Sequence, residues 1–553
     1  MILTGAQILI EELIRHGTKI VFGYPGGSVL DIYDELYKNS DRIEHVLSAH
    51  EQGAAHAADG YARVTGSPGV VIATSGPGAT NLVTGIANAY LDSVPLIAIT
   101  GNVSVSLIGK DSFQEVDIIG ITQPVVKHSY ILRDVNELES VISEAFIIAS
   151  TGRKGPVLID ISKSVQQDTC EYTGSFDARP AMKPPRREIP DPTETLAAIS
   201  QSQKPYIYCG GGVIASHAEE EIIELSNRIA APIGLSLMGL TAIPGSCPRN
   251  LGMCGMHGKY ASSVAQSEAD LLIAVGVRFS DRATGDAEEY SKKCTVIHID
   301  IDDAELGKNV TSKIELCGDA KSVLRALLQE LPKIEHDEWM QRVLELKRQD
   351  ETVSEPDSFT PQNIIQLVNK HTTPDTLIAT DVGQHQMWVM QHYSFSKPHT
   401  LISSGGLGAM GYGMGAAIGG CLASGKAQTV LFTGDGSFGM NLTEMATAVS
   451  QKLPLVIVLL NNGALGMVRQ WQSIFYDEHY SSSTLRRKTD FVKLAQAFGA
   501  DGATVSSISE LEEVFEGGFP SDKPFLIECQ IDMDEKVFPM IPSGMSVGDI
   551  ILS

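Results

Sequence analysis

The sequence predicts an α/β protein made of three open, parallel-sheet α/β domains, and three observations support this. The chain has 553 residues, too many for one hydrophobic core, so about three or four domains are expected. Short apolar runs alternate with helical patterns along the chain, as at 69–74, 205–212 and 429–436, which is typical of parallel sheets. Apolar residues make up 43% and charged residues 20% of the chain, as in ordinary globular proteins.

Two linker-like stretches indicate where these domains end. Residues 176–192 are rich in proline and charge, and residues 335–361 have the pattern of a charged helix followed by a proline-containing loop. They divide the chain into domains of about 1–180, 190–335 and 357–553.

Charge and composition exclude several classes of function. The net charge of −25 argues against binding to nucleic acid or to an anionic membrane, because both require a basic surface. No run reaches the ~20 apolar residues of a membrane span, and the N-terminus lacks a signal-peptide pattern. Eight cysteines without a CxxC pair indicate free thiols in a reducing compartment, so a cytoplasmic protein is expected.

The first and third predicted domains resemble each other. Residues 70–102 align with residues 429–462, and both run strand, Gly-rich turn, Asn-Leu, helix, proline, strand. One explanation is chance similarity between two βαβ units, which are common. The other is that two related α/β domains flank a different central domain.

An aspartate and an asparagine in the third domain indicate a metal site. Asp435 and Asn462 follow consecutive apolar runs and are 27 residues apart, close to the ~30 residues of one βαβ unit. Neighbouring parallel strands would bring both side chains to the carboxyl edge of the sheet. Their hard oxygen donors suit Mg2+, and Gly434, Gly436 and Gly439 would let the backbone approach a diphosphate at a helix N-terminus. Asp-Gly and Asn-Asn are also common turn residues, so the hypothesis depends on the pair.

The pattern GDG, about 27 residues, then NN resembles the signature of thiamine-diphosphate (ThDP) enzymes. This resemblance implies one domain for the aminopyrimidine and one for the diphosphate. It also implies that Glu51 hydrogen-bonds the pyrimidine ring, so that the cofactor can lose its thiazolium C2 proton. Without this context, Glu51 would be a surface residue that complements a helix dipole, and Met410 a core methionine.

Further cofactor contacts follow only from the resemblance. Met410 would support the bent cofactor, and the backbone carbonyl of Ala464 would be the third protein ligand of the metal. The other expected ThDP contacts are Pro25, Gly26, Gly76, Asn81, Gly383, Gln384, His385, Gln386, Gly434, Gly436 and Ser437.

Additional motifs resemble one ThDP family, the large catalytic subunit of biosynthetic acetohydroxyacid synthase (acetolactate synthase). They cover essentially the whole chain and are found at 24–27, 50–55, 113–115, 251–258, 275–285, 298–302 and 461–472. The implied substrates are pyruvate and 2-ketobutyrate, leading to 2-acetolactate and 2-aceto-2-hydroxybutyrate in branched-chain amino acid biosynthesis.

The resemblance assigns substrate roles to several residues. Arg282 would hold the carboxylate of the second keto acid, because a guanidinium suits a carboxylate, and Trp471 would set the volume of the alkyl pocket. The remaining members are Met467 and Val468 along the channel and Gln114 and Lys163 near its mouth. The alternatives are an ordinary surface ion pair for Arg282 and core burial for Trp471.

The same resemblance implies FAD in the central domain and partners outside the chain. The matched FAD positions are Arg153, Gly210, Gly211, Gly212, Met256, His257, Arg278, Asp300 and Asp319. The implied partners are a second copy in a homodimer or homotetramer, with active sites at the dimer interface, and a separate regulatory small subunit.

Some residues depart from the family pattern, and other functions remain open. Ser280, Ser162 and Ser164 replace residues usual in the family, the last two beside Lys163, and Gly415 is expected to loosen a helix start. The alternatives are a catabolic acetolactate synthase without FAD, a ThDP-dependent pyruvate oxidase or decarboxylase, and a non-catalytic flavin- or nucleotide-binding protein.

Overall fold

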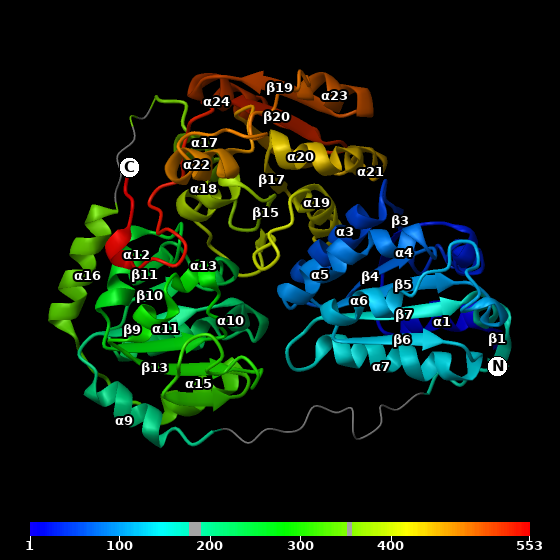
Figure 1. The fold of residues 1–553 in the computed structure, drawn as a ribbon, viewed down its shortest axis with the longest axis horizontal. Coiled ribbons are helices and arrows are strands. Elements are labelled where there is room, and N and C mark those ends of the chain that lie inside the picture. Colours follow the sequence, from blue (N-terminus) through cyan, green and yellow to red (C-terminus); the bar gives the residue numbers. More distant parts are fainter. Residues whose placement is uncertain (176–189, 351–354, 356) are drawn as a thin grey trace.

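The structure is a computed structural model that describes residues 1–175, 190–350, 355 and 357–553 (Figure 1). Three six-stranded sheets lie at the centres of three α/β domains, and their strands pair in parallel. The predicted fold class is therefore confirmed. In Figure 1 the first domain is blue to cyan, the central domain green, and the third yellow to red.

The two predicted linkers are described by the structure to different extents. Most of 176–192 lies outside the described residues, and 335–361 contains helix α16 (Asp337–Gln349) as the charge pattern predicts. The domain limits themselves stay predictions.

The sheet of the first domain has the strand order β3-β2-β4-β5-β7-β6. Its strands are β2 (Ile20–Tyr24), β3 (Glu44–Leu47), β4 (Gly69–Ala73), β5 (Leu96–Asn102), β6 (His128–Leu132) and β7 (Pro156–Ser162). Its helices are α1 (Gly5–Arg15), α2 (Leu30–Lys38), α3 (Glu51–Thr65), α4 (Pro77–Asn81), α5 (Val83–Leu91), α6 (Ile118–Thr122), α7 (Leu138–Ser150) and α8 (Lys163–Gln167). Strands β1 (Ile2–Thr4) and β8 (Thr169–Glu171) form a separate antiparallel pair.

The sheet of the third domain has the order β16-β15-β17-β18-β20-β19. Its strands are β15 (Leu377–Thr380), β16 (Leu401–Ile402), β17 (Thr429–Gly434), β18 (Leu455–Asn461), β19 (Asp501–Val505) and β20 (Phe525–Gln530). Its helices are α17 (Pro361–Lys370), α18 (Gln384–His392), α19 (Tyr412–Ala423), α20 (Asp435–Asn441), α21 (Met445–Ser450), α22 (Gly466–Phe475), α23 (Phe491–Phe498) and α24 (Ile508–Gly517). When the six strands of each sheet are numbered in chain order, the third sheet has the same strand order as the first. This supports the interpretation of two related domains.

The central sheet has a different order, β11-β10-β9-β12-β13-β14, which is the strand order of the dinucleotide-binding fold. Its strands are β9 (Pro205–Cys209), β10 (Ile233–Leu235), β11 (Asn250–Met253), β12 (Leu271–Val275), β13 (Thr295–Asp300) and β14 (Ile314–Cys317). Its helices, besides α16, are α9 (Thr193–Gln201), α10 (Gly211–Ala215), α11 (Glu219–Arg228), α12 (Tyr260–Glu268), α13 (Asp281–Thr284), α14 (Ala287–Ser291) and α15 (Ala320–Glu330).

Both faces of each sheet are covered, which explains why the strands are almost uniformly apolar. In β4, Val70 and Ile72 pack into one hydrophobic cluster, whereas Val71 and Ala73 pack into another on the opposite face. Alternate residues of one strand thus supply both cores, as the period of two requires. Within the described residues, no helix is both long and apolar enough to cross a membrane.

Helices α3 and α19 join the first domain to the third at very close range. A β-carbon added at Gly419 would overlap the carbonyl oxygen of Ala57, and one added at Gly60 would overlap that of Ala416. Gly415 likewise lies against the carbonyl oxygen of Gly53. The expectation that Gly415 loosens its helix is therefore not met, because α19 runs without a break from Tyr412 and uses this glycine for contact.

Buried charges reinforce this contact. Arg63 of α3 pairs with Asp59 at 2.6 Å and with Asp92 at 2.8 Å, and both carboxylates are fully buried. Tyr412 of α19 donates its hydroxyl to Asp59 at 2.6 Å, and the backbone N–H of Gly406 donates to Asp92 at 2.7 Å. Removing one partner would leave a charge buried and unpaired, so the network favours a single docking geometry.

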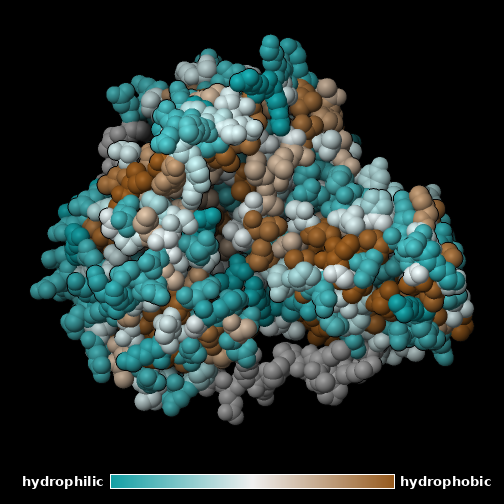
Figure 2. All heavy atoms as spheres, in the orientation of Figure 1, coloured by the Kyte–Doolittle hydropathy of each residue, from teal (hydrophilic) through white to brown (hydrophobic). Residues whose placement is uncertain are grey.

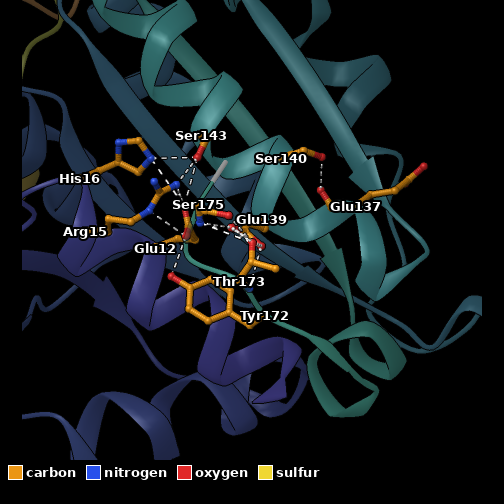
Figure 3. Close-up of polar contacts among 10 residues, drawn as sticks. All are labelled: Glu12, Arg15, His16, Glu137, Glu139, Ser140, Ser143, Tyr172, Thr173 and Ser175. Carbon is orange, nitrogen blue, oxygen red and sulfur yellow. Dashed lines mark hydrogen bonds and ion pairs between the residues drawn. The ribbon is translucent and has the colours of Figure 1, made fainter. Parts of the chain in front are cut away.

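Another buried carboxylate, that of Glu12, holds the N-terminal helix in the first domain (Figure 3). Glu12 of α1 is fully buried and accepts hydrogen bonds from Arg15 at 2.6 Å and from the Tyr172 hydroxyl at 2.8 Å. Ser143 of α7 donates to the same carboxylate at 3.1 Å. Burial opposes ionisation, but hydrogen bonds from His16, Arg15 and Tyr172 lower the pKa of Glu12 from 4.5 to about 2.

We expect Glu12→Gln to destabilise the protein by about 3 kcal/mol at pH 7, because it leaves Arg15 without its carboxylate. The folded-state pKa lies below the unfolded one, so this contribution is complete above pH 4.5 and is lost as pH falls toward 2. Urea unfolding of both proteins between pH 7 and pH 3.5 should show the difference narrowing below about pH 5.

The matched control for this prediction is Glu11→Gln. Glu11 pairs with Arg42 on the surface, so its loss should cost less than about 1 kcal/mol. Equal losses of stability for the two variants, or a difference independent of pH, would contradict the assignment.

Candidate functional site

Most of the predicted site residues follow strands at the carboxyl edges of the three sheets, next to the points where strand order reverses. Arg153 precedes β7 and lies at the opposite edge of the first sheet. In the third domain this point lies between β15 and β17, and residues 381–386 and 434–437 follow those strands. In the first domain it lies between β2 and β4, which precede Pro25 and Gly76. Open α/β sheets bind ligands at such switch points.

Asp435 and Asn462 are neighbours in space. Strands β17 and β18 pair in parallel up to Gly434 and Leu460, so both residues leave the same edge of the sheet. Burial raises the pKa of Asp435 to about 6, although backbone hydrogen bonds, one of them from Asn462, act against this. Asp435 Oδ1 is buried without a hydrogen-bond partner, and an oxygen in this situation can coordinate a cation. The pair therefore fits Mg2+.

The residues around this pair are held by hydrogen bonds. Asn462 accepts from the Ala464 N–H at 3.1 Å and donates to Gln384 at 3.2 Å. Gln384 itself donates to Gln470 at 3.0 Å, and Ser437 donates to the Val382 carbonyl at 2.7 Å. These contacts fix the positions of the predicted diphosphate residues. The ligand role of the Ala464 carbonyl stays a prediction.

Gly383 and the first turn of α18 pack closely against the glycine turn at 434–436. The imidazole of His385 lies between Gly383 and Gly434, where added β-carbons would crowd it, and burial lowers its pKa to about 3. His385 is therefore neutral at neutral pH. Gln386 donates to Ser403 at 2.8 Å. The Met410 methyl lies 3.7 Å from the β-carbon position of Gly436.

The first domain holds a second group of predicted residues. Glu51 begins α3 and accepts a hydrogen bond from Asn81 at 2.9 Å. Gly76 has a φ of 61°, and an added β-carbon there would lie 2.9 Å from Gln114. The other members are Pro25, Gly26, which packs against Thr74, and Lys163, which donates to the Gly27 carbonyl at 3.1 Å.

One residue of this group was missed by sequence reasoning. Glu444 of the third domain is 1% exposed and accepts hydrogen bonds from the backbone N–H groups of Ala49, at 3.2 Å, and His50, at 3.1 Å. It therefore clamps the turn that presents Glu51. No local pattern marks Glu444, because its partners lie almost 400 residues away.

A cavity of about 1690 Å3 lies between the three domains. Its lining includes these predicted FAD and site residues: Arg153, Gly211, Gly212, Met256, His257, Arg278, Asp300, Asp319, Gly383, Gln386, Met410, Met467 and Trp471. Gly210 does not line the cavity but packs against Gly276, whose φ of 60° lets the two backbones approach closely. The volume and the dinucleotide-type strand order suit a large nucleotide cofactor such as FAD.

The polar groups of this cavity are partly paired already. Arg153 forms ion pairs with Glu305 at 2.8 Å and with Asp302 at 3.3 Å, and Asp300 accepts from the Asp302 N–H at 2.9 Å. Asp319 caps α15. His257 Nδ1 is buried without a partner and thus offers one free hydrogen-bonding position for a ligand.

Arg282 and Trp471 meet at one part of the cavity wall. The Arg282 guanidinium carbon lies 5.9 Å from the centre of the Trp471 ring, although the two residues belong to different domains. Met467 and Val468 line the same wall. Trp471 is only partly buried, so core burial does not describe it. Arg282 forms an exposed ion pair with Asp281 at 3.9 Å, as its alternative predicts, and the same guanidinium lies at the cavity wall.

The structure does not bring all predicted residues into one pocket. The cavity lining contains neither the Glu51 group nor the Asp435–Asn462 pair. Glu51 and Trp471 therefore belong to separate surfaces of a single chain.

Three family models place this arrangement in a class of protein. The chain matches the N-terminal TPP binding domain of thiamine pyrophosphate enzymes over 3–121, their central domain over 193–327 and their C-terminal TPP binding domain over 381–529. Thiamine pyrophosphate is another name for ThDP. The fold and the site thus define a ThDP enzyme.

Similar proteins narrow the class. The "Acetolactate synthase isozyme 2 large subunit" of Escherichia coli K12 is 42% identical, with 99% of each chain covered. The "Probable acetolactate synthase large subunit" of Methanocaldococcus jannaschii is 42% identical over 99% of this chain and 95% of its own. The "Acetolactate synthase large subunit" of Cyanidium caldarium is 44% identical over 99% and 96%. The chain belongs to the family of acetolactate synthase large subunits.

We expect Glu444→Gln to lower turnover roughly 10- to 100-fold with little change in KM, because small misplacement of a catalytic group has effects of this size. The glutamine carbonyl could replace only one carboxylate oxygen, so its NH2 group would face the Ala49 N–H and weaken the hold on the turn before Glu51. Steady-state kinetics at saturating cofactor measure this.

Thr447→Val is the control. It removes the 2.7 Å hydrogen bond from the Thr447 hydroxyl to Glu444 Oε2 but keeps both carboxylate oxygens that accept from Ala49 and His50. A Glu444→Gln protein with normal turnover would exclude the positioning role.

Proposed function

We propose that this chain is the catalytic subunit of an acetolactate synthase. It would decarboxylate pyruvate and join the remaining two-carbon unit to a second pyruvate or to 2-ketobutyrate. The products would be 2-acetolactate and 2-aceto-2-hydroxybutyrate, which lead to valine, leucine and isoleucine. The observation that carries this proposal is the meeting of Arg282 with Trp471 at the shared cavity.

These two side chains suit the second keto acid. Arg282 donates a hydrogen bond to Ser543 at 3.3 Å and lies 3.9 Å from the Asp281 carboxylate. Its side chain is 60% exposed, so the guanidinium would be accessible to a substrate carboxylate. The rigid Trp471 indole, with Met467 beside it, would bound the alkyl group of the substrate. Gln114 and Lys163 would approach the channel mouth from the first domain of a second copy of the chain.

The predicted cofactor-binding residues would have separate roles. When bound, ThDP supplies the electron sink that a 2-keto acid needs to lose CO2. Asp435 and Asn462 would hold Mg2+ and, with residues 383–386 and 434–437, orient the diphosphate. Glu51 would move a proton at its carboxylate, which the Asn81 amide orients.

FAD would occupy the cavity of the central domain. The nine FAD positions carried over from the family lie on it or, in the case of Gly210, directly beneath it. The reaction has no net redox change, so the role of FAD here would be structural. This separates the proposal from the catabolic, FAD-free enzymes and from pyruvate oxidases.

A second copy of the chain would complete the active site. The Glu51 group and the Trp471 wall occupy separate surfaces, and apolar side chains stand exposed near Glu51, with Phe113 at 88% and Leu107 at 45%. Figure 2 shows hydrophobic surface gathered over α4 and α5 of the first domain. A homodimer, or a homotetramer built from it, would cover this surface.

Two further features belong to the proposal. The relatives are named large subunits, and a separate regulatory small subunit is expected here as well. None of the eight cysteines, all of which are among the described residues, forms a disulfide, which fits a reducing compartment such as the cytoplasm.

The proposal is tested by incubating the full-length protein with pyruvate, with and without ThDP, Mg2+ and FAD. Acetolactate should form only with ThDP and Mg2+, and the purified protein should show flavin absorbance. Glu51→Gln should bind ThDP normally and lose most turnover. Peroxide or free acetaldehyde as the main product, or a colourless active protein, would overturn the proposal.

We expect Trp471→Leu to reduce the preference for 2-ketobutyrate over pyruvate by roughly 10-fold or more. The two keto acids differ by one methylene group, and contacts with one methylene in an apolar pocket are worth about this much. Competition between the two keto acids, with both products quantified, measures the ratio. Phe475→Leu is the control, because the Phe475 ring packs at a tilt against the Trp471 indole, with ring centres 5.2 Å apart, but does not line the cavity. An unchanged product ratio in Trp471→Leu would remove this residue from the pocket.

A further inference from the structure

Three potential metal ligands meet away from the ThDP site. His217 lies in the turn between α10 and α11, Glu219 begins α11, and His399 precedes β16 of the third domain. Their nearest ligand atoms all lie within 4.8 Å of one another, and the two imidazole centres are 5.3 Å apart. Ligand atoms around a tetrahedral Zn2+ are separated by ~3.3 Å, given bonds of about 2.0–2.1 Å. Small shifts of these side chains would therefore bring the three ligand atoms to the spacing that a bound Zn2+ requires.

His399 is already oriented as a metal ligand. Its Nδ1 lies 3.3 Å from the carbonyl oxygen of Arg63, which can only accept, so Nδ1 carries the proton. The other nitrogen, Nε2, then has a free lone pair and is buried without a hydrogen-bond partner. Metal-binding histidines commonly donate one nitrogen to a backbone carbonyl and ligate through the other.

Glu219 also has an unused oxygen at this place. Its Oε1 is buried and lacks a hydrogen-bond partner. Leaving such an oxygen unpaired is costly, and a cation would relieve the cost. Two independent side chains therefore present an orphaned donor atom to the same small space.

Both histidines have an unusual backbone conformation. His217 has a φ of 53° and His399 a φ of 61°, both in the left-handed region that is uncommon for non-glycine residues. The nearby ammonium of Lys321 donates to the His217 carbonyl at 2.6 Å and lies 3.7 Å from Glu221, so its charge is partly compensated.

We propose that His217, Glu219 and His399 form a binding site for a divalent transition-metal ion, with Zn2+ as the preferred occupant. Two imidazole nitrogens and one carboxylate oxygen are a common Zn2+ donor set, with water at the fourth position. Mg2+ is disfavoured, because it prefers oxygen ligands in an octahedral arrangement.

The bound metal would tie the domains together beside the cavity. His217 and Glu219 belong to the central domain, His399 to the third, and the Arg63 carbonyl behind His399 to the first. His399 also lines the cavity. The ion would thus stabilise the domain arrangement that forms the cavity and would have no part in the chemistry at Glu51.

The test uses the full-length protein, stripped with a chelator and then supplied with excess Mg2+ and ThDP. Co2+ titration should produce the visible absorption of tetrahedral Co2+ at one ion per chain, and Zn2+ should displace it. His217→Ala and Glu219→Gln should each weaken Co2+ binding at least about tenfold, since even outer-shell changes cost 10–100-fold.

His128→Ala is the matched control, because His128 is an exposed histidine on β6 of the first domain, where it packs on Tyr130. It should bind Co2+ as the wild type does. Zn2+ should also raise the Tm of the wild type and of His128→Ala but not that of His217→Ala. No Co2+ absorption in the wild type, or equal affinity in His217→Ala, would overturn the proposal.

Discussion

The close contact between α3 and α19 is the constraint on which the rest of the structure depends. Glycines at Gly60 and Gly419 bring two helical backbones into direct contact, and the charges of Asp59, Arg63 and Asp92 are buried beside them. A side chain at either glycine, or the loss of one charge, would be costly. The contact therefore fixes the first domain against the third, and with it the end of α3 that carries Glu51.

The functional surfaces follow from this docking. The central and third sheets present their carboxyl edges to the space between the domains, and the first sheet presents its amino edge. This space is a cavity of about 1690 Å3 rather than a packed core. Its wall combines Arg282 of the central domain with Trp471 of the third, while Glu444 of the third domain positions the turn before Glu51. In a protein with a net charge of −25, anionic ligands would be held by such local groups.

Much of the fold was predictable because its signals are local. Alternating apolar runs marked the strands, and the similarity of 70–102 to 429–462 marked two domains that share one strand order. The neighbouring positions of Asp435 and Asn462 followed from the length of one βαβ unit. The partners of Arg153, the clamp by Glu444 and the cluster around His399 could not be predicted, since each joins separate domains.

The sequence by itself determined the fold class, the family and the residue types available at each strand end, because these depend on periodicity and short motifs. Only the tertiary structure decided which of those residues share a surface. It placed Arg282 beside Trp471 but kept Glu51 away from the cavity, and it brought His217 to His399. The physical reason is that domain docking is set by shape and buried charge, as it is where α3 meets α19, and neither produces a periodic pattern in the sequence.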